Sequence, residues 1–144
     1  MVIKLEKIAI IDLGSNTARL LIVDVVENSH FYIVDQLKEA PRLGEGMERD
    51  GFLKPARIRE TVNTLKMFRK LCDVNHIERI IAVATAAVRR AKNQRSFLDE
   101  VSSFFIVLFN SGIFSNNSLM ICHFLRLPIA ELLATSFQLV FTIT

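Results

Sequence analysis

A segment near the start of the chain, residues 8–24, constrains the fold more than any other. It reads I-A-I-I-D-L-G-S-N-T-A-R-L-L-I-V-D, so two apolar runs flank a polar turn that contains glycine. This pattern predicts a β-hairpin whose turn carries several hydrogen-bonding groups. Gly14 would let the backbone approach a ligand closely, and the amides of a tight turn can converge on one anion. Phosphate is therefore the ligand that this turn favours.

The composition limits the class of protein. The 144 residues are enough for about one domain, and the formal net charge of +3 comes from dispersed residues, so nucleic acid is not expected as a partner. Charges among the first seven residues interrupt the apolar segment that a signal peptide requires, so we expect a cytoplasmic protein. Neither the cysteines nor the histidines have partners at metal-ligand spacing, and we expect structural or solvent positions for Cys72, Cys122, His30, His76 and His123.

The hydrophobic pattern predicts a mixed α/β sheet with flanking helices. Three apolar runs, at 7–12, 18–25 and 31–38, predict an antiparallel meander, and the first two are typical of strands covered on both faces. Pro41 and three glycines then mark a long turn-rich loop over 41–51.

The pattern becomes helical after this loop. Apolar residues spaced by three or four from 55 to 74 predict an amphipathic helix whose basic residues form a solvated face. The β-branched run 79–84 predicts a buried strand, and 93–101 predicts a short helix. Strands that pair first antiparallel and then cross over through helices give a mixed sheet, whose ligands are expected at strand ends.

Three segments carry a family resemblance. They read I-D-L-G-S-N-T-A-R-L-L, R-L-G-E-G-M and A-V-A-T-A-A-V-R-R-A-K-N, and in this order they resemble the N-terminal domain of the exopolyphosphatase/guanosine pentaphosphate phosphatase family. The resemblance covers residues 5–101 and implies a ribonuclease H-like fold, as in actin, sugar kinases and heat-shock proteins, with the first domain incomplete. It also implies a hydrolase that acts on the terminal phosphoanhydride of inorganic polyphosphate or guanosine pentaphosphate, with Mg²⁺ as cofactor. A homodimer is left open.

The resemblance also assigns roles to individual residues. It implies that phosphate is bound by Gly14, Ser15, Asn16, Thr17, Arg19 and Arg89. Asp12 matches an acid that lies near the divalent metal or its waters, and the approach would be lined by Arg42, Gly44, Glu45 and Thr85. Such a set suits the chemistry, because phosphoanhydride hydrolysis depends on positioning and on offsetting negative charge, and an arginine can engage two phosphate oxygens.

Simpler interpretations stand beside these roles. Asp12 could cap the turn by bonding to the amides that follow it. Arg19 alternates with apolar neighbours, so it could be an edge-facing charge of a strand. Arg89 and Arg90 could form a solvated helix start. Residues 15–17 would be ordinary turn residues in most proteins.

The family's catalytic base has no counterpart in this chain, so no catalytic residue is assigned. The family places a glutamate within a pattern like S-G-x-E-E-A, and such a base must reach the attacking water. Residues 104–109 could form the preceding strand and 110–112 read N-S-G, but I-F-S follows where the acids belong. A second phosphate loop resembling D-x-G-G-G-S is also missing. We expect an incomplete phosphate clamp, and whether the chain is itself an enzyme stays open.

Charge falls abruptly after Val101, which divides the chain into a partial phosphate-binding domain at 1–101 and an atypical apolar tail at 102–144. In the tail only Arg126 and Glu131 are charged. One hypothesis is an out-of-frame or truncated end. The other is a non-catalytic phosphate- or nucleotide-binding module with a membrane- or partner-binding tail. A membrane span is not favoured, because these charges interrupt the run of about 20 apolar residues that a span needs.

Overall fold

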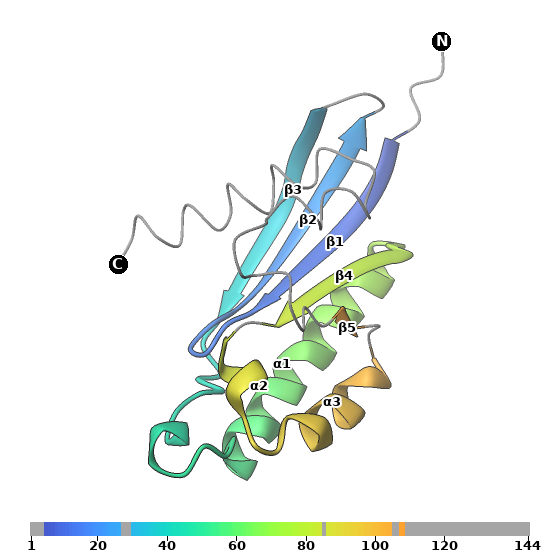
Figure 1. Cartoon of the computed structure of the whole chain (residues 1–144). Coiled ribbons are helices and arrows are strands. Elements are labelled where there is room, and N and C mark those ends of the chain that lie inside the picture. Colours follow the sequence, from blue (N-terminus) through green and yellow to red (C-terminus); the bar gives the residue numbers. More distant parts are fainter. Residues whose placement is uncertain (1–4, 27–29, 85, 105–106, 109–144) are drawn as a thin grey trace.

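The computed structural model describes residues 5–26, 30–84, 86–104 and 107–108. Within them, strands form one sheet in the order β3-β2-β1-β4-β5, and Figure 1 shows the helices gathered beside β4 and β5. The strands are β1 (Leu5–Leu13), β2 (Ala18–Val26), β3 (His30–Glu39), β4 (Arg79–Ala84) and β5 (Val107–Leu108). The helices are α1 (Pro55–Val74), α2 (Ala86–Arg90) and α3 (Gln94–Ser102), and η1 (Met47–Arg49) is a short 3-10 helix.

The predicted meander and mixed sheet are confirmed. β1 pairs antiparallel with β2, and β2 pairs antiparallel with β3, with a register shift between Ile22 and Val23. β1 also pairs parallel with β4, which in turn pairs parallel with β5. The strands extend slightly beyond the apolar runs because backbone pairing continues into the flanking polar residues. The 3-10 helix η1 lies in the loop that the sequence predicts as irregular.

Strand β1 is buried on both faces, as its continuous apolar run predicts. Ala9 and Ile11 belong to the main core cluster, which also contains Phe68 of α1 and Phe97 of α3. Ile8 and its neighbours on β2 and β4 form a second apolar cluster. Because side chains alternate along a strand, the two clusters lie on opposite faces of the sheet. The helices cover the first of them.

Helix α1 has the bounds that the sequence predicts, and its ends explain them. Pro55 occupies the first turn, where its missing amide costs nothing. After the last turn, His76 adopts a φ of 55°. Its amide donates to the Asp73 carbonyl at 3.1 Å, and the amide of Ile77 donates to the Cys72 carbonyl at 2.9 Å. These bonds form a Schellman motif, which ends the helix without a glycine.

Part of the predicted tail lies outside the described residues. Strand β5 falls inside the apolar run 104–109, where the sequence allows a strand. Residues 109–144 are outside the described ranges, so the character of the tail stays a prediction. Among the helices of the described ranges, none combines the length and apolarity needed to cross a membrane.

Candidate phosphate-binding site

The carboxyl ends of β1 and β4 meet at one edge of the sheet. The two strands are parallel, and Leu13 lies opposite Ala84. The turn 14–17 follows β1, and α2 begins just after β4. The topology therefore makes the predicted phosphate turn and the helix that carries Arg89 neighbours, at the kind of strand end where α/β proteins bind ligands.

The turn 14–17 contacts the protein through its carbonyl groups. The Thr17 carbonyl accepts from the Gly14 amide at 2.8 Å, which closes the turn, and the carbonyls of Ser15 and Asn16 accept from the loop after β3. Within the described part of the chain, the amides of Ser15, Asn16 and Thr17 have no protein acceptor, and Ser15 and Asn16 are exposed. The turn thus keeps its donors available, as an anion-binding turn must.

Asp12 lies opposite Arg19 in the β1–β2 pair, so both side chains lie on the same face of the sheet. By strand alternation this is the face of Ile10, away from α1. The Oδ1 atom of Asp12 is buried and has no hydrogen-bond partner among the described residues. Burial raises the pKa of Asp12, and the Arg19 guanidinium offsets part of the rise. A turn cap would use a carboxylate oxygen of Asp12, so the unpartnered Oδ1 atom does not support the capping role.

The loop after β3 packs between the turn and α2. The Arg42 amide donates to the Asn16 carbonyl at 3.0 Å, and the Gly44 amide donates to the Ser15 carbonyl at 2.8 Å. A methyl group on Gly44 would lie 3.0 Å from the Cβ of Ser15 and 3.5 Å from the Cβ of Ala87. This close approach to both elements requires glycine, although Gly44 needs no unusual φ.

Glu45 is held by the first turns of α1. Its carboxylate lies 3.1 Å from Nε of Arg57, whose Nη1 is also 2.6 Å from Oε2 of Glu60. The sequence predicts Arg57 as part of a solvated basic face, and Arg59 on that face is indeed exposed. Arg57 is only half-buried but links the loop to the helix. This contact is tertiary, so helical periodicity could not predict it.

Comparisons with known proteins identify the lineage. The profile of the Ppx/GppA phosphatase family matches residues 21–107. The chain belongs to this family. Exopolyphosphatase 2 of Mycobacterium tuberculosis is 34% identical over 96 residues, which are 65% of this chain and 30% of that protein. This chain therefore spans less than a third of that relative's length.

Solved structures agree with this assignment. The crystal structure of the Aquifex aeolicus Ppx/GppA family member superposes with a TM-score of 0.68 at 36% identity, over 72% of this chain and 34% of that one. An exopolyphosphatase from Cytophaga hutchinsonii superposes with a TM-score of 0.65 at 31% identity, over 71% of this chain and 32% of that one. The predicted family and its actin-like fold are thus confirmed for the aligned part of the chain.

The Ppx/GppA profile contains some of the predicted site residues and not others. Arg42, Gly44, Glu45 and Arg89 fall within the matched residues, whereas the turn precedes them. Arg89 is exposed near the end of α2, while the preceding residues Ala87 and Val88 are buried. Arg89 and Arg90 thus end a helix and do not start one. Thr85 lies outside the described residues.

Two further observations concern metal and thiol chemistry. Within the described ranges, no group of three or more His, Cys, Asp or Glu side chains is placed to hold a metal ion. Cys72 is buried, and burial raises the pKa of its thiol to about 11, so it stays protonated and unreactive near neutral pH. This agrees with the expected structural role of Cys72, whereas Cys122 lies outside the described residues.

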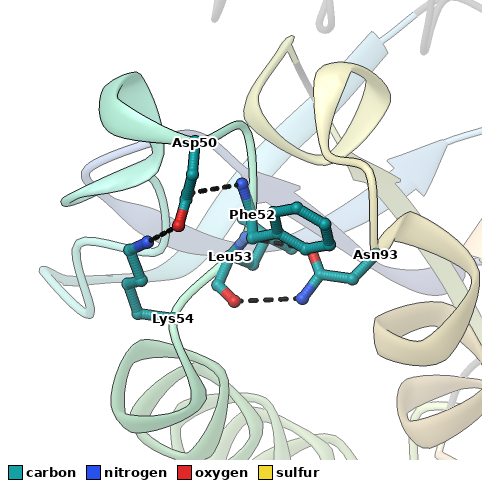
Figure 2. Close-up of polar contacts among 5 residues, drawn as sticks. All are labelled: Asp50, Phe52, Leu53, Lys54 and Asn93. Atoms are coloured by element: carbon teal, nitrogen blue, oxygen red, sulfur yellow. Dashed lines mark hydrogen bonds and ion pairs between the residues drawn. The ribbon is translucent and has the colours of Figure 1, made fainter.

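Sequence reasoning missed one residue with long-range contacts at this site. Asn93 ends the motif A-V-A-T-A-A-V-R-R-A-K-N, and the sequence predicts it only as the start of a helix. Its side chain bonds to the backbone of Leu53, 40 residues away (Figure 2). Leu53 lies at the end of the loop that carries Gly44. An asparagine before a helix normally caps that helix, so nothing in the sequence pattern itself reveals the longer contact.

Proposed function

We propose that this chain is the phosphate-holding N-terminal domain of a phosphatase that acts on terminal phosphoanhydrides, and that it binds such substrates without hydrolysing them by itself. The substrate class is inorganic polyphosphate or guanosine pentaphosphate, which share a terminal phosphoanhydride. The observation that carries the proposal is the turn 14–17, whose carbonyls are bonded to protein while its central amides have no acceptor among the described residues.

Binding would rest on the turn and on the arginine of α2. The amides of residues 15–17 and the hydroxyls of Ser15 and Thr17 would donate to oxygens of the terminal phosphoryl group. Arg89, on the helix that follows β4, would add two parallel donors in a planar fork. Arg19 would act mainly through Asp12, because it lies opposite that carboxylate in the sheet.

Asp12 also fits the implied Mg²⁺. This ion binds through one or two carboxylates together with substrate phosphates and keeps several waters. The buried Oδ1 atom of Asp12, which has no partner among the described residues, is a suitable oxygen for the ion or its waters. When bound, the ion would offset phosphate charge. A single carboxylate together with substrate phosphates can bind Mg²⁺. The described residues contain no larger acidic cluster, and this mode of binding does not require one.

Hydrolysis needs a base that this chain does not supply. In phosphoanhydride hydrolysis a water attacks the terminal phosphoryl group, and a general base within hydrogen-bond reach must activate that water. Asp12 lies at the end of β1 on the same face as Arg19, and it would serve as an oxygen donor for the cation, not as the base. In residues 102–144 the sequence contains one acid, Glu131, outside any S-G-x-E-E-A pattern. Binding without turnover is therefore the expected behaviour.

A phosphate-release assay separates binding from catalysis. Purified chain is incubated with polyphosphate and Mg²⁺, and inorganic phosphate is measured against a protein-free control. We expect no release above the control, together with measurable binding of tripolyphosphate by calorimetry. Robust release that disappears in Arg89→Ala would show that the chain is an enzyme and would contradict the second half of the proposal. Absence of both binding and release would contradict the first half.

A further inference from the structure

The end of the loop that carries Gly44 is fastened to the residues that follow α2 (Figure 2). The Leu53 amide donates to Oδ1 of Asn93 at 2.9 Å, and Nδ2 of Asn93 donates to the Leu53 carbonyl at 3.0 Å. The Lys92 amide donates to the Gly51 carbonyl at 2.9 Å. Three hydrogen bonds therefore join two short segments that lie far apart in the sequence.

The Asn93 side chain makes this contact in place of a more local one. Asn93 is the N-cap residue of α3, yet it makes no side-chain cap hydrogen bond. Asparagine is favoured at this position because its oxygen usually accepts from the first turn of its own helix. Here both polar atoms of the side chain are used on Leu53, and both contacts are partly buried. The Asn93 side chain thus bonds the loop and does not cap its own helix.

The same loop is fastened at its other end to the phosphate turn. Arg42 and Gly44 donate their amides to the carbonyls of Asn16 and Ser15. The loop therefore bonds the turn 14–17 at one end and Lys92 and Asn93 at the other. These two residues follow α2, the helix that carries Arg89. Gly44 also lies against Ala87 of that helix, so helix, loop and turn form one packed unit.

Given the proposed phosphate site, we propose that Asn93 is a positioning residue for it. Through its two bonds to Leu53, Asn93 fixes α2, and with it Arg89, relative to the turn 14–17. It does not touch the ligand. If the two Asn93–Leu53 hydrogen bonds are lost, α2 and the loop can move apart. Arg89 is then misplaced, and the contacts of Gly44 with the turn weaken. Residues that act through a neighbour in this way change the coupling to a binding site by about two- to thirtyfold.

The test uses the full chain, with tripolyphosphate as the probe and two readouts. One is the tripolyphosphate affinity measured by calorimetry, and the other is the hydrogen-exchange rate of the Gly44 amide without ligand. In Asn93→Ala we expect an affinity loss of about tenfold and faster exchange at Gly44. Asn93→Asp keeps the acceptor for the Leu53 amide but sets a carboxylate oxygen against the Leu53 carbonyl, so it should give changes of the same sign and serves if the alanine variant does not fold.

Asn75→Ala is the matched control. Asn75 also bonds a backbone carbonyl through its side-chain amide, at 2.8 Å to Leu71, but it lies at the far end of α1. We expect it to leave both readouts unchanged. Faster exchange confined to Leu53, with Gly44 unaffected, would overturn the positioning role. If the wild-type chain itself fails to bind tripolyphosphate, the proposed function fails, and the exchange rate at Gly44 still decides whether Asn93 controls the turn.

Discussion

Replacing Arg89 by alanine is expected to weaken tripolyphosphate binding by about ten- to a hundredfold. A hydrogen bond to a charged group is worth about 1.5–3 kcal/mol, which corresponds to about ten- to a hundredfold in affinity. Because solvent screens the exposed Arg89, we expect the two bonds of its planar fork together to contribute no more than this. The side chain is exposed near the end of α2, so the substitution removes no core packing. Calorimetric titration at constant ionic strength measures the change, and thermal unfolding confirms that the variant stays folded.

Arg90→Ala is the matched control for this prediction. Arg90 is the next residue of the same helix, carries the same charge and is also exposed, but it lies about 100° further around the helix axis than Arg89. A long-range charge effect would be screened by salt and would be similar for the two arginines. We therefore expect a much smaller loss for Arg90→Ala. Equal losses for the two variants would show that α2 attracts phosphate only through its net charge.

Replacing Asp12 by asparagine is expected to stabilise the domain at neutral pH, because burial penalises a charged carboxylate more than an uncharged amide. Burial raises the pKa of Asp12 more than Arg19 lowers it, so the charged carboxylate is unfavourable in the folded state. The substitution removes this charge while keeping the shape of the side chain. The free energy of unfolding from urea titration measures the gain.

The pH dependence of this gain has a definite sign. Because the pKa of folded Asp12 is raised, the folded state holds the proton more tightly than the unfolded chain does. Wild-type stability therefore increases as the pH falls through the raised pKa toward the ordinary aspartate value of 3.8. The advantage of Asp12→Asn should be full at neutral pH and should shrink over this interval.

Asp99→Asn provides the comparison, because Asp99 is exposed on α3 and such surface changes usually stay within about 0.5 kcal/mol. A stability gain of Asp12→Asn that does not change with pH would assign the gain to packing and not to the buried charge. A loss of stability at neutral pH would mean that Arg19 stabilises the carboxylate more than burial penalises it.

Local pattern was sufficient to predict most of the elements. The continuous apolar run of β1 predicts burial on both faces, and Ile8 and Ile11 are both fully buried. The spacing of Val62, Leu65 and Phe68 predicts the inward face of α1, and these residues are buried. Such predictions succeed because one pattern, the spacing of the apolar residues, indicates both the type of element and the face that it buries.

The arrangement of the site depends on contacts that no local pattern carries. The Arg57–Glu45 ion pair and the Asn93–Leu53 hydrogen bonds join residues that are not neighbours in the sequence, so they follow only from tertiary packing. Arg42 adopts a left-handed φ of 51°, a conformation that glycine usually adopts. The sequence therefore gives no sign of it. The sequence resemblance supplied candidate residues, and the structure showed how the loop links them.

The central claim is that the turn 14–17 binds phosphate through its amides. Titration of the ¹⁵N-labelled chain with tripolyphosphate, followed by amide chemical shifts in NMR spectra, tests this most directly. We predict the largest saturable shifts at Ser15, Asn16 and Thr17, with smaller ones at Gly44 and in α2. Shifts spread over the exposed basic face of α1, around Arg59 and Lys66, with none in the turn would contradict the claim.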